Sequence, residues 1–140
     1  MSRILQGANP PLSLSSAKME NTNQDILIIS YLNVRGQTGL TVEKQFQIED
    51  FLKETNSDIL HLQETQIDDE TFSECTFIDA NFSVITNNAQ NKYGTASIVK
   101  NDLAVENVIC DTNGRILIFE IAGVTFGNMY LPSGTDAGRL

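Results

Sequence analysis

The sequence predicts an α/β layered sandwich with mixed or antiparallel sheets. A β-branched and aromatic run, DILIISYLN at 25–33, precedes a helical pattern at 42–55 and a second apolar run, DILHLQ at 58–63. Five short apolar runs separated by turn residues then fill the second half of the chain. A β-α-β opening followed by a meander of strands is typical of helices packed on sheets.

The helix is predicted by the segment VEKQFQIEDFLKET at 42–55, where apolar residues recur three and four positions apart along one stripe. Thr41 is a suitable N-cap, and Glu43 places a negative charge in the first turn. Asn56 can end the helix because asparagine tolerates a left-handed conformation. The run at 25–33 is continuous rather than alternating, so we expect a strand buried on both faces.

The remaining elements follow from short runs and turns. The expected strands are FSVIT (82–86), TASIVK (95–100), AVENVI (104–109), RILIFEI (115–121) and VTFGNMYL (124–131). The segments DTNG at 111–114 and AG at 122–123 predict hairpin turns. Residues 1–24 contain two prolines, four serines and no sustained periodicity, so we expect a disordered leader and a domain over 25–140.

Composition limits the partners of the chain. There are 9 basic and 18 acidic residues, a net charge of −9, which disfavours non-specific binding to nucleic acid but suits a divalent cation. No apolar run is long enough to span a membrane, and the first residues lack the apolar core of a secretory signal. We therefore expect no membrane contact, an intracellular (nuclear or cytoplasmic) location, and reduced thiols at Cys75 and Cys110.

Three expected strands end on side chains that could carry chemistry. The first ends at Asn33, the second reaches Glu64, and the last ends near Tyr130. An amide oxygen and a carboxylate are ligands suited to Mg²⁺, and a tyrosine nearby can hydrogen-bond a phosphate. Each residue alone also has an ordinary explanation, because asparagine forms turns, a glutamate at a strand end is solvated, and a tyrosine packs at the edge of a core.

Four segments in order, SYLNVRG, DILHLQETQID, YGTASIVK and NMYLPSG, resemble the endonuclease/exonuclease/phosphatase superfamily. The L-N-V-R-G and Y-L-P-S-G segments are most similar to the endonuclease domain of non-LTR retrotransposons, to which exonuclease III-like abasic-site endonucleases are related. The resemblance covers about 25–140. It implies a four-layer α/β/β/α sandwich of the DNase I-like type, of which this chain carries about the first half.

The resemblance also implies a site. Asn33 corresponds to the metal- and phosphate-binding asparagine, Glu64 to the principal metal ligand, and Tyr130 to the tyrosine that contacts the scissile phosphate. The implied cofactor is Mg²⁺ (or Mn²⁺), which polarises the phosphoryl oxygen and lowers the pKa of bound water. Gln63 is expected to orient Glu64, while Arg35 and Asn128 are weaker candidates for phosphate contact or support of the site.

Two acidic or basic features are given structural interpretations. His61 is the only histidine, but alternation places it on the face of Ile59 and Gln63, opposite Leu60 and Leu62, so we interpret it as a structural residue. The family's catalytic histidine lies much later in the chain. The stretch Asp68-Asp69-Glu70 is interpreted as a solvated loop rather than a second metal site.

The family's G-D-x-N and S-D-H segments do not occur in this sequence. We therefore expect the second sheet to be largely absent, an apolar face and a strand edge open to association, and no nuclease activity from this chain alone. DNA is the expected partner of a full-length relative, with weak or no binding by this acidic chain. The alternatives are a non-catalytic remnant or interaction fragment, and a phosphodiesterase of the same superfamily acting on RNA or phospholipid.

Overall fold

The computed structural model describes residues 4–5, 26–35, 41–66, 75, 81–88 and 94–132. Its elements are β1 (Ile4–Leu5), β2 (Ile26–Leu27), β3 (Ile29–Asn33), α1 (Val42–Thr55), β4 (Ile59–Gln63), β5 (Phe82–Asn87), β6 (Thr95–Lys100), β7 (Val105–Cys110), β8 (Ile116–Ile121) and β9 (Val124–Met129). The predicted helix has the bounds expected from the sequence, and each predicted strand of the second half is present within two residues of its expected ends.

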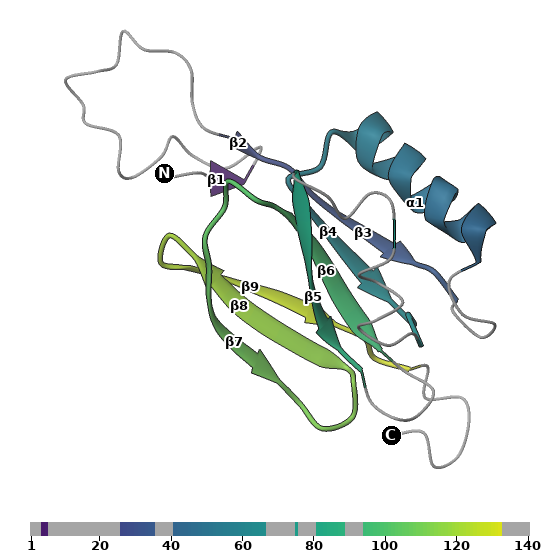
Figure 1. Cartoon of the computed structure of the whole chain (residues 1–140). Coiled ribbons are helices and arrows are strands. Elements are labelled where there is room, and N and C mark those ends of the chain that lie inside the picture. The colour runs from purple at the N-terminus through teal and green to yellow at the C-terminus, as the bar shows by residue number, and fades with distance from the viewer. Residues whose placement is uncertain are drawn as a thin grey trace, which may run out of the picture.

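The strands form two main sheets. The first has the order β3-β4-β6-β5, in which β3 and β4 are parallel and the other neighbours are antiparallel. The second is the antiparallel meander β7-β8-β9. Helix α1 covers one face of the first sheet and the second sheet covers the other (Figure 1), which confirms the layered α/β architecture with mixed and antiparallel sheets.

Strand β4 contributes to two separate cores. Leu60 and Leu62 pack toward α1 together with Ile48 and Leu52 of the helix. Ile59 packs on the opposite face, in the cluster that includes Leu117 and Phe119 of the second sheet. Successive side chains of a strand point to opposite faces, so one central strand holds both layers together.

Both predicted caps of α1 are confirmed. The Thr41 side chain accepts a hydrogen bond from the Lys44 backbone N–H at 3.3 Å. Asn56 is left-handed, with φ 50°, and its backbone N–H turns back to the Leu52 and Lys53 carbonyls. A left-handed residue after the last turn satisfies carbonyls that the helix leaves unpaired, so the chain can turn directly into β4.

The first strand differs from the prediction, because β3 is not buried on both faces. It lies at the edge of its sheet, and the Tyr31 side chain is 57% exposed. The second sheet packs mainly on β4, β5 and β6, so it does not shield the same face of β3. An apolar run identifies a strand, but its exposure is set by which strands lie beside and above it.

The extent of the second sheet also differs from the prediction. Three strands of the second sheet are present and packed, whereas we expected that sheet to be largely absent. The meander needs only two short connections, so it forms from a local stretch of chain. Residues Ile4–Leu5 form β1, which pairs in parallel with β2.

The described part of the second sheet leaves apolar side chains exposed at its edges. Strands β7 and β9 are the edge strands, and Ile109, Val124 and Met129 are all about half exposed or more. Among the described residues, no helix has the length and apolar content needed to cross a membrane.

Candidate metal and phosphate site

The predicted site residues meet at one edge of the molecule, which we call the rim. Asn33 is paired with Gln63 at the end of β3 and β4, and Gln63 is paired with Thr95 at the start of β6. Strand β9 ends at the same edge, because Gln63 Nε2 donates to the Met129 carbonyl at 2.8 Å. The rim therefore joins both sheets, as the strand endings in the sequence predicted.

Asn33 and Glu64 are in direct contact. Asn33 Nδ2 donates to Glu64 Oε1 at 2.9 Å, and Asn33 Oδ1 accepts from the Arg35 backbone N–H at 3.0 Å. The opposite amide orientation would place two oxygens together and two N–H groups together, so these contacts fix which way the amide points. Asn33 thus orients the Glu64 carboxylate toward the end of the sheet.

The backbone around this contact is left-handed at three residues that are not glycine. The φ angles are 46° at Arg35, 55° at Glu64 and 48° at Gln66. Each such conformation costs about 1–2 kcal/mol for a residue with a side chain. Strained backbone gathers where the surrounding structure over-determines it, and functional sites are a common location.

Tyr130 follows β9 directly and is half-buried. Its backbone N–H donates to the Arg115 carbonyl at 2.8 Å, which continues the pairing with β8. Gln63, the last residue of β4, donates to the carbonyl of Met129, the residue before Tyr130. Tyr130 therefore follows directly after the contact between β4 and β9. Arg35 is exposed at the rim, and its carbonyl accepts from Lys44 Nζ at 2.7 Å.

Asn128 lies below the rim rather than on it. Its side chain is fully buried between the sheets, and Nδ2 donates to the Leu62 carbonyl at 3.0 Å and the Ala96 carbonyl at 2.9 Å. A phosphate-binding role does not fit this burial. The contacts instead tie β9 to β4 and β6, so Asn128 supports the packing of the sheets below the rim.

His61 has the structural role expected from its position. It is fully buried between the sheets, its Nδ1 lies 2.7 Å from Ser97 Oγ, and its ring centre lies 4.9 Å from that of Tyr31. Burial lowers the pKa of His61 to about 4, so it is neutral near pH 7. The stretch Asp68-Asp69-Glu70 lies outside the described residues.

A third polar link between the sheets, made by Asn87, has no signal in the sequence. Asn87 Nδ2, at the end of β5, donates to Asp111 Oδ1 and to the Ile116 carbonyl, both at 2.8 Å. Burial would raise the pKa of Asp111, but hydrogen bonds from the Ile116 and Arg115 backbone N–H groups and from Asn87 outweigh it and lower that pKa. The DTNG segment predicted the turn; nothing in the sequence pairs it with Asn87.

The donor set at the rim fits a hard divalent cation. No cluster of three His, Cys, Asp or Glu residues exists in the part of the chain that the structure describes. Mg²⁺ does not require one, because it is often held by one or two protein carboxylates and keeps several waters. Glu64 is half-exposed with one carboxylate oxygen bonded to Asn33, so it would be the direct ligand and Asn33 would orient it.

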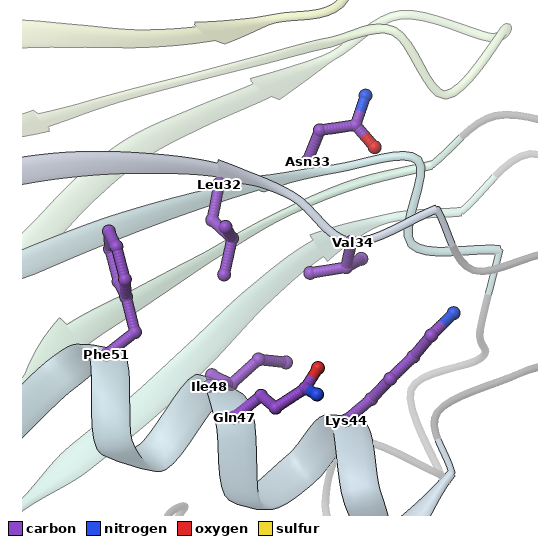
Figure 2. A pocket seen from close by; sticks show the side chains of 7 residues that line it. All are labelled: Leu32, Asn33, Val34, Lys44, Gln47, Ile48 and Phe51. Atoms are coloured by element: carbon purple, nitrogen blue, oxygen red, sulfur yellow. The ribbon is translucent and has the colours of Figure 1, made fainter.

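A pocket of about 230 Å³ lies on the other side of β3, between that strand and α1. Figure 2 shows that Leu32 and Val34 point from the strand toward Ile48 and Phe51 of the helix, whereas the Asn33 side chain points away from them. Asn33 is among the residues that line this pocket, but its side chain points away from the apolar residues that form most of it.

No protein-family model and no curated protein matches the sequence. Solved structures do match: an AP endonuclease from Archaeoglobus fulgidus is 25% identical, with TM-score 0.64, over 81% of this chain and 45% of that protein. The 3′ phosphatase NExo from Neisseria, bound to product DNA hairpin, is 22% identical, with TM-score 0.59, over 73% and 40%. Truncated TDP2 from Caenorhabditis elegans is 25% identical, with TM-score 0.53, over 76% and 47%.

The chain thus spans less than half the length of these three structures. They share its layered arrangement of helix and sheets, and their names describe enzymes that include an AP endonuclease and a 3′ phosphatase. The chain therefore has a partial fold of the DNase I-like superfamily, the superfamily indicated by its strand-end motifs.

Proposed function

We propose that the rim is the cation-binding part of a phosphodiesterase site, derived from a DNA-nicking endonuclease of a non-LTR retroelement. The observation that carries the proposal is the 2.9 Å contact between Asn33 and Glu64 at the end of two parallel strands. Glu64 would hold Mg²⁺ or Mn²⁺, and Asn33 would keep its carboxylate oriented. When bound, such an ion polarises a phosphoryl oxygen and lowers the pKa of water.

The other rim residues receive supporting roles in this proposal. Gln63 links the Glu64 turn to β9 through the Met129 carbonyl, which would keep Tyr130 at a constant distance from the cation. Tyr130 would hydrogen-bond the phosphate through its hydroxyl group. Arg35 is exposed at the same edge and would contact the DNA backbone.

We further propose that the 140-residue chain does not turn over DNA by itself. Its sequence contains neither G-D-x-N nor S-D-H, the segments that orient the nucleophile and contact the phosphate in the family it resembles. A net charge of −9 also opposes DNA binding, because phosphate contacts depend on Lys and Arg. These two observations favour a non-catalytic interaction role for the chain on its own.

The cation proposal is tested by Mn²⁺ titration followed by electron paramagnetic resonance. We expect Glu64→Gln to weaken the tightest binding at least tenfold. Glu49→Gln is the matched control, because Glu49 is a surface carboxylate paired with Lys53 at 2.9 Å on α1. Equal binding by the wild type and Glu64→Gln would contradict the proposal.

Activity is tested separately with supercoiled plasmid and Mg²⁺. We expect no nicking by the chain. Nicking that Glu64→Ala abolishes would contradict the proposed inactivity while supporting the nuclease site. The retroelement origin is tested on the coding DNA beyond the codon for Leu140, where G-D-x-N, S-D-H and then a reverse-transcriptase pattern are expected.

A further inference from the structure

The turn that carries Glu64 is held from the neighbouring strand. Thr65 is fully buried, and its backbone N–H donates to the Gly94 carbonyl at 3.1 Å, just before β6 begins. The residues on either side of Thr65, Glu64 and Gln66, are both left-handed. A buried side chain between two strained residues indicates that the surroundings, rather than local preference, set the course of this turn.

Gly94 leaves room for that turn. It is buried, with φ 145°, and a Cβ added there would lie 2.5 Å from Thr65 Oγ1 and 3.0 Å from the Gln66 backbone nitrogen. A Cβ at this position would force Thr65 to shift and would crowd the Gln66 backbone, and the φ angle itself disfavours any residue with a side chain. Thr65 Oγ1 has no hydrogen-bond partner within the described ranges, so packing rather than hydrogen bonding holds the side chain in place.

We propose that Gly94 is a positioning residue for the Glu64 carboxylate. Its backbone seats Thr65, the seated Thr65 fixes the left-handed turn, and the turn aims Glu64 at Asn33. The inference rests on the proposed function in one respect, since the divalent cation is what the aligned carboxylate would hold. Its geometric part, the alignment of Glu64 with Asn33, can be measured without a cation.

The chain supplies a matched control in Gly123. It also has a positive φ, 78°, but a Cβ added there would meet no heavy atom within 4 Å. Gly123→Ala therefore introduces backbone strain alone, whereas Gly94→Ala introduces strain and a collision with Thr65 and Gln66. An effect on the Asn33–Glu64 contact that appears in Gly94→Ala and not in Gly123→Ala therefore reports the positioning role of Gly94.

The first measurement is the side-chain amide signal of Asn33 in ¹H–¹⁵N spectra of the full chain. We expect Gly94→Ala to move this signal toward its position in Glu64→Ala, because both remove the Asn33–Glu64 hydrogen bond. Gly123→Ala should leave it in place. An Asn33 signal that is unchanged in Gly94→Ala would overturn the inference.

The second measurement is Mn²⁺ affinity. We expect Gly94→Ala to weaken binding at least fivefold and Gly123→Ala to leave it unchanged. Should Gly94→Ala not fold, Thr65→Ala replaces it, since emptying the seat beside Gly94 should also release the Glu64 turn and shift the Asn33 signal. Mn²⁺ binding that is insensitive to Glu64→Ala would contradict the proposed function, whereas the Asn33 signal decides the positioning role.

Discussion

Two carboxylates flank β4, and their surroundings differ sharply. Asp58 precedes the strand, where Oδ2 accepts from the Ile28 backbone N–H at 2.8 Å and Oδ1 pairs with Lys100 Nζ at 3.0 Å. Glu64 follows the strand, in a left-handed turn, and among the described residues its carboxylate is bonded to Asn33 alone, at 2.9 Å. The same strand thus has a carboxylate with a backbone and a lysine partner at one end, and a carboxylate bonded to one asparagine side chain at the other.

The wider surroundings of the two ends follow the same division. Beside Asp58, Ser57 Oγ donates to Ser30 Oγ at 2.7 Å and is also bonded to Thr55, so the hydroxyl groups there are engaged with one another. At the rim, Arg35, Glu64 and Gln66 have left-handed backbones, and the Asn33–Glu64 hydrogen bond is exposed. Asp58 and Glu64 carry the same functional group, but they differ in the number of hydrogen-bond and ion-pair partners that the fold gives them.

The largest expected effect is on stability at the Asp58 end. Asp58→Ala leaves the Ile28 N–H without its acceptor and Lys100 without its partner, which should lower the free energy of unfolding by about 3 to 4 kcal/mol. Chemical denaturation measures it. Asp102→Ala is the control because Asp102 is exposed nearby, and it should change little. A loss below 1 kcal/mol for Asp58→Ala would contradict a structural role for this carboxylate.

The burial of His61, which lies in β4 between Asp58 and Glu64, is tested by measuring stability as a function of pH. The pKa of His61 is lowered by burial to about 4, from about 6.5 in the unfolded chain. The unfolded state therefore binds a proton first, so the stability is fully present above pH 6.5 and falls by about 3 kcal/mol as the pH drops toward 4. His61→Phe should show a correspondingly flatter profile over this range; identical profiles would show that His61 is not desolvated.

A smaller effect is expected at the link between β5 and the β7–β8 turn. Asp111→Ala removes an acceptor for Asn87 and for two backbone N–H groups, which should cost about 1 to 2 kcal/mol at pH 7. Because the pKa of Asp111 is lowered, its stabilisation is present above the carboxyl's ordinary pKa and is lost as the pH falls below about 4. The wild type and variant should therefore converge in acid, and a constant difference would contradict this.

The smallest change in stability is expected at Glu64. Glycine adopts a positive φ freely, so Glu64→Gly relieves backbone strain while removing one exposed hydrogen bond. We expect the free energy of unfolding to change by less than about 1 kcal/mol, because the relieved strain is offset by the greater entropy of the unfolded chain and the lost hydrogen bond. Thermal unfolding of Glu64→Gly and Asp58→Ala, measured in parallel, compares the two changes in the free energy of unfolding. A strongly destabilised Glu64→Gly would mean that the fold needs Glu64 as much as it needs Asp58.

Local signals predicted the elements well. The helix over 42–55 and its caps at Thr41 and Asn56 depend on neighbouring residues, and the structure has them where the sequence placed them. The strand endings likewise predicted that Asn33, Glu64 and Tyr130 lie at one edge. Side-chain alternation also assigned His61 to the face of Ile59, and in the structure that face packs against the second sheet.

Features that depend on contacts between distant residues were not predictable. The exposure of β3 follows from the order of strands in the sheet, and the burial of Asn128 follows from the packing of β9 on β4 and β6. The hydrogen bond from the Thr65 backbone N–H to the Gly94 carbonyl joins the turn after β4 to the residue before β6. A single sequence does not show which distant segments pair or in what register, so these features could not be predicted from it.

We propose that the Glu64 end of β4 binds a divalent cation and that the Asp58 end does not. Mn²⁺ broadens nearby nuclear magnetic resonance signals, so one titration of the wild-type chain reports on both ends. We predict that the amide signals of Asn33, Gln63 and Glu64 broaden first, while those of Ile28, Asp58 and Lys100 stay sharp. Equal broadening at both ends, or broadening that avoids Glu64, would contradict the account.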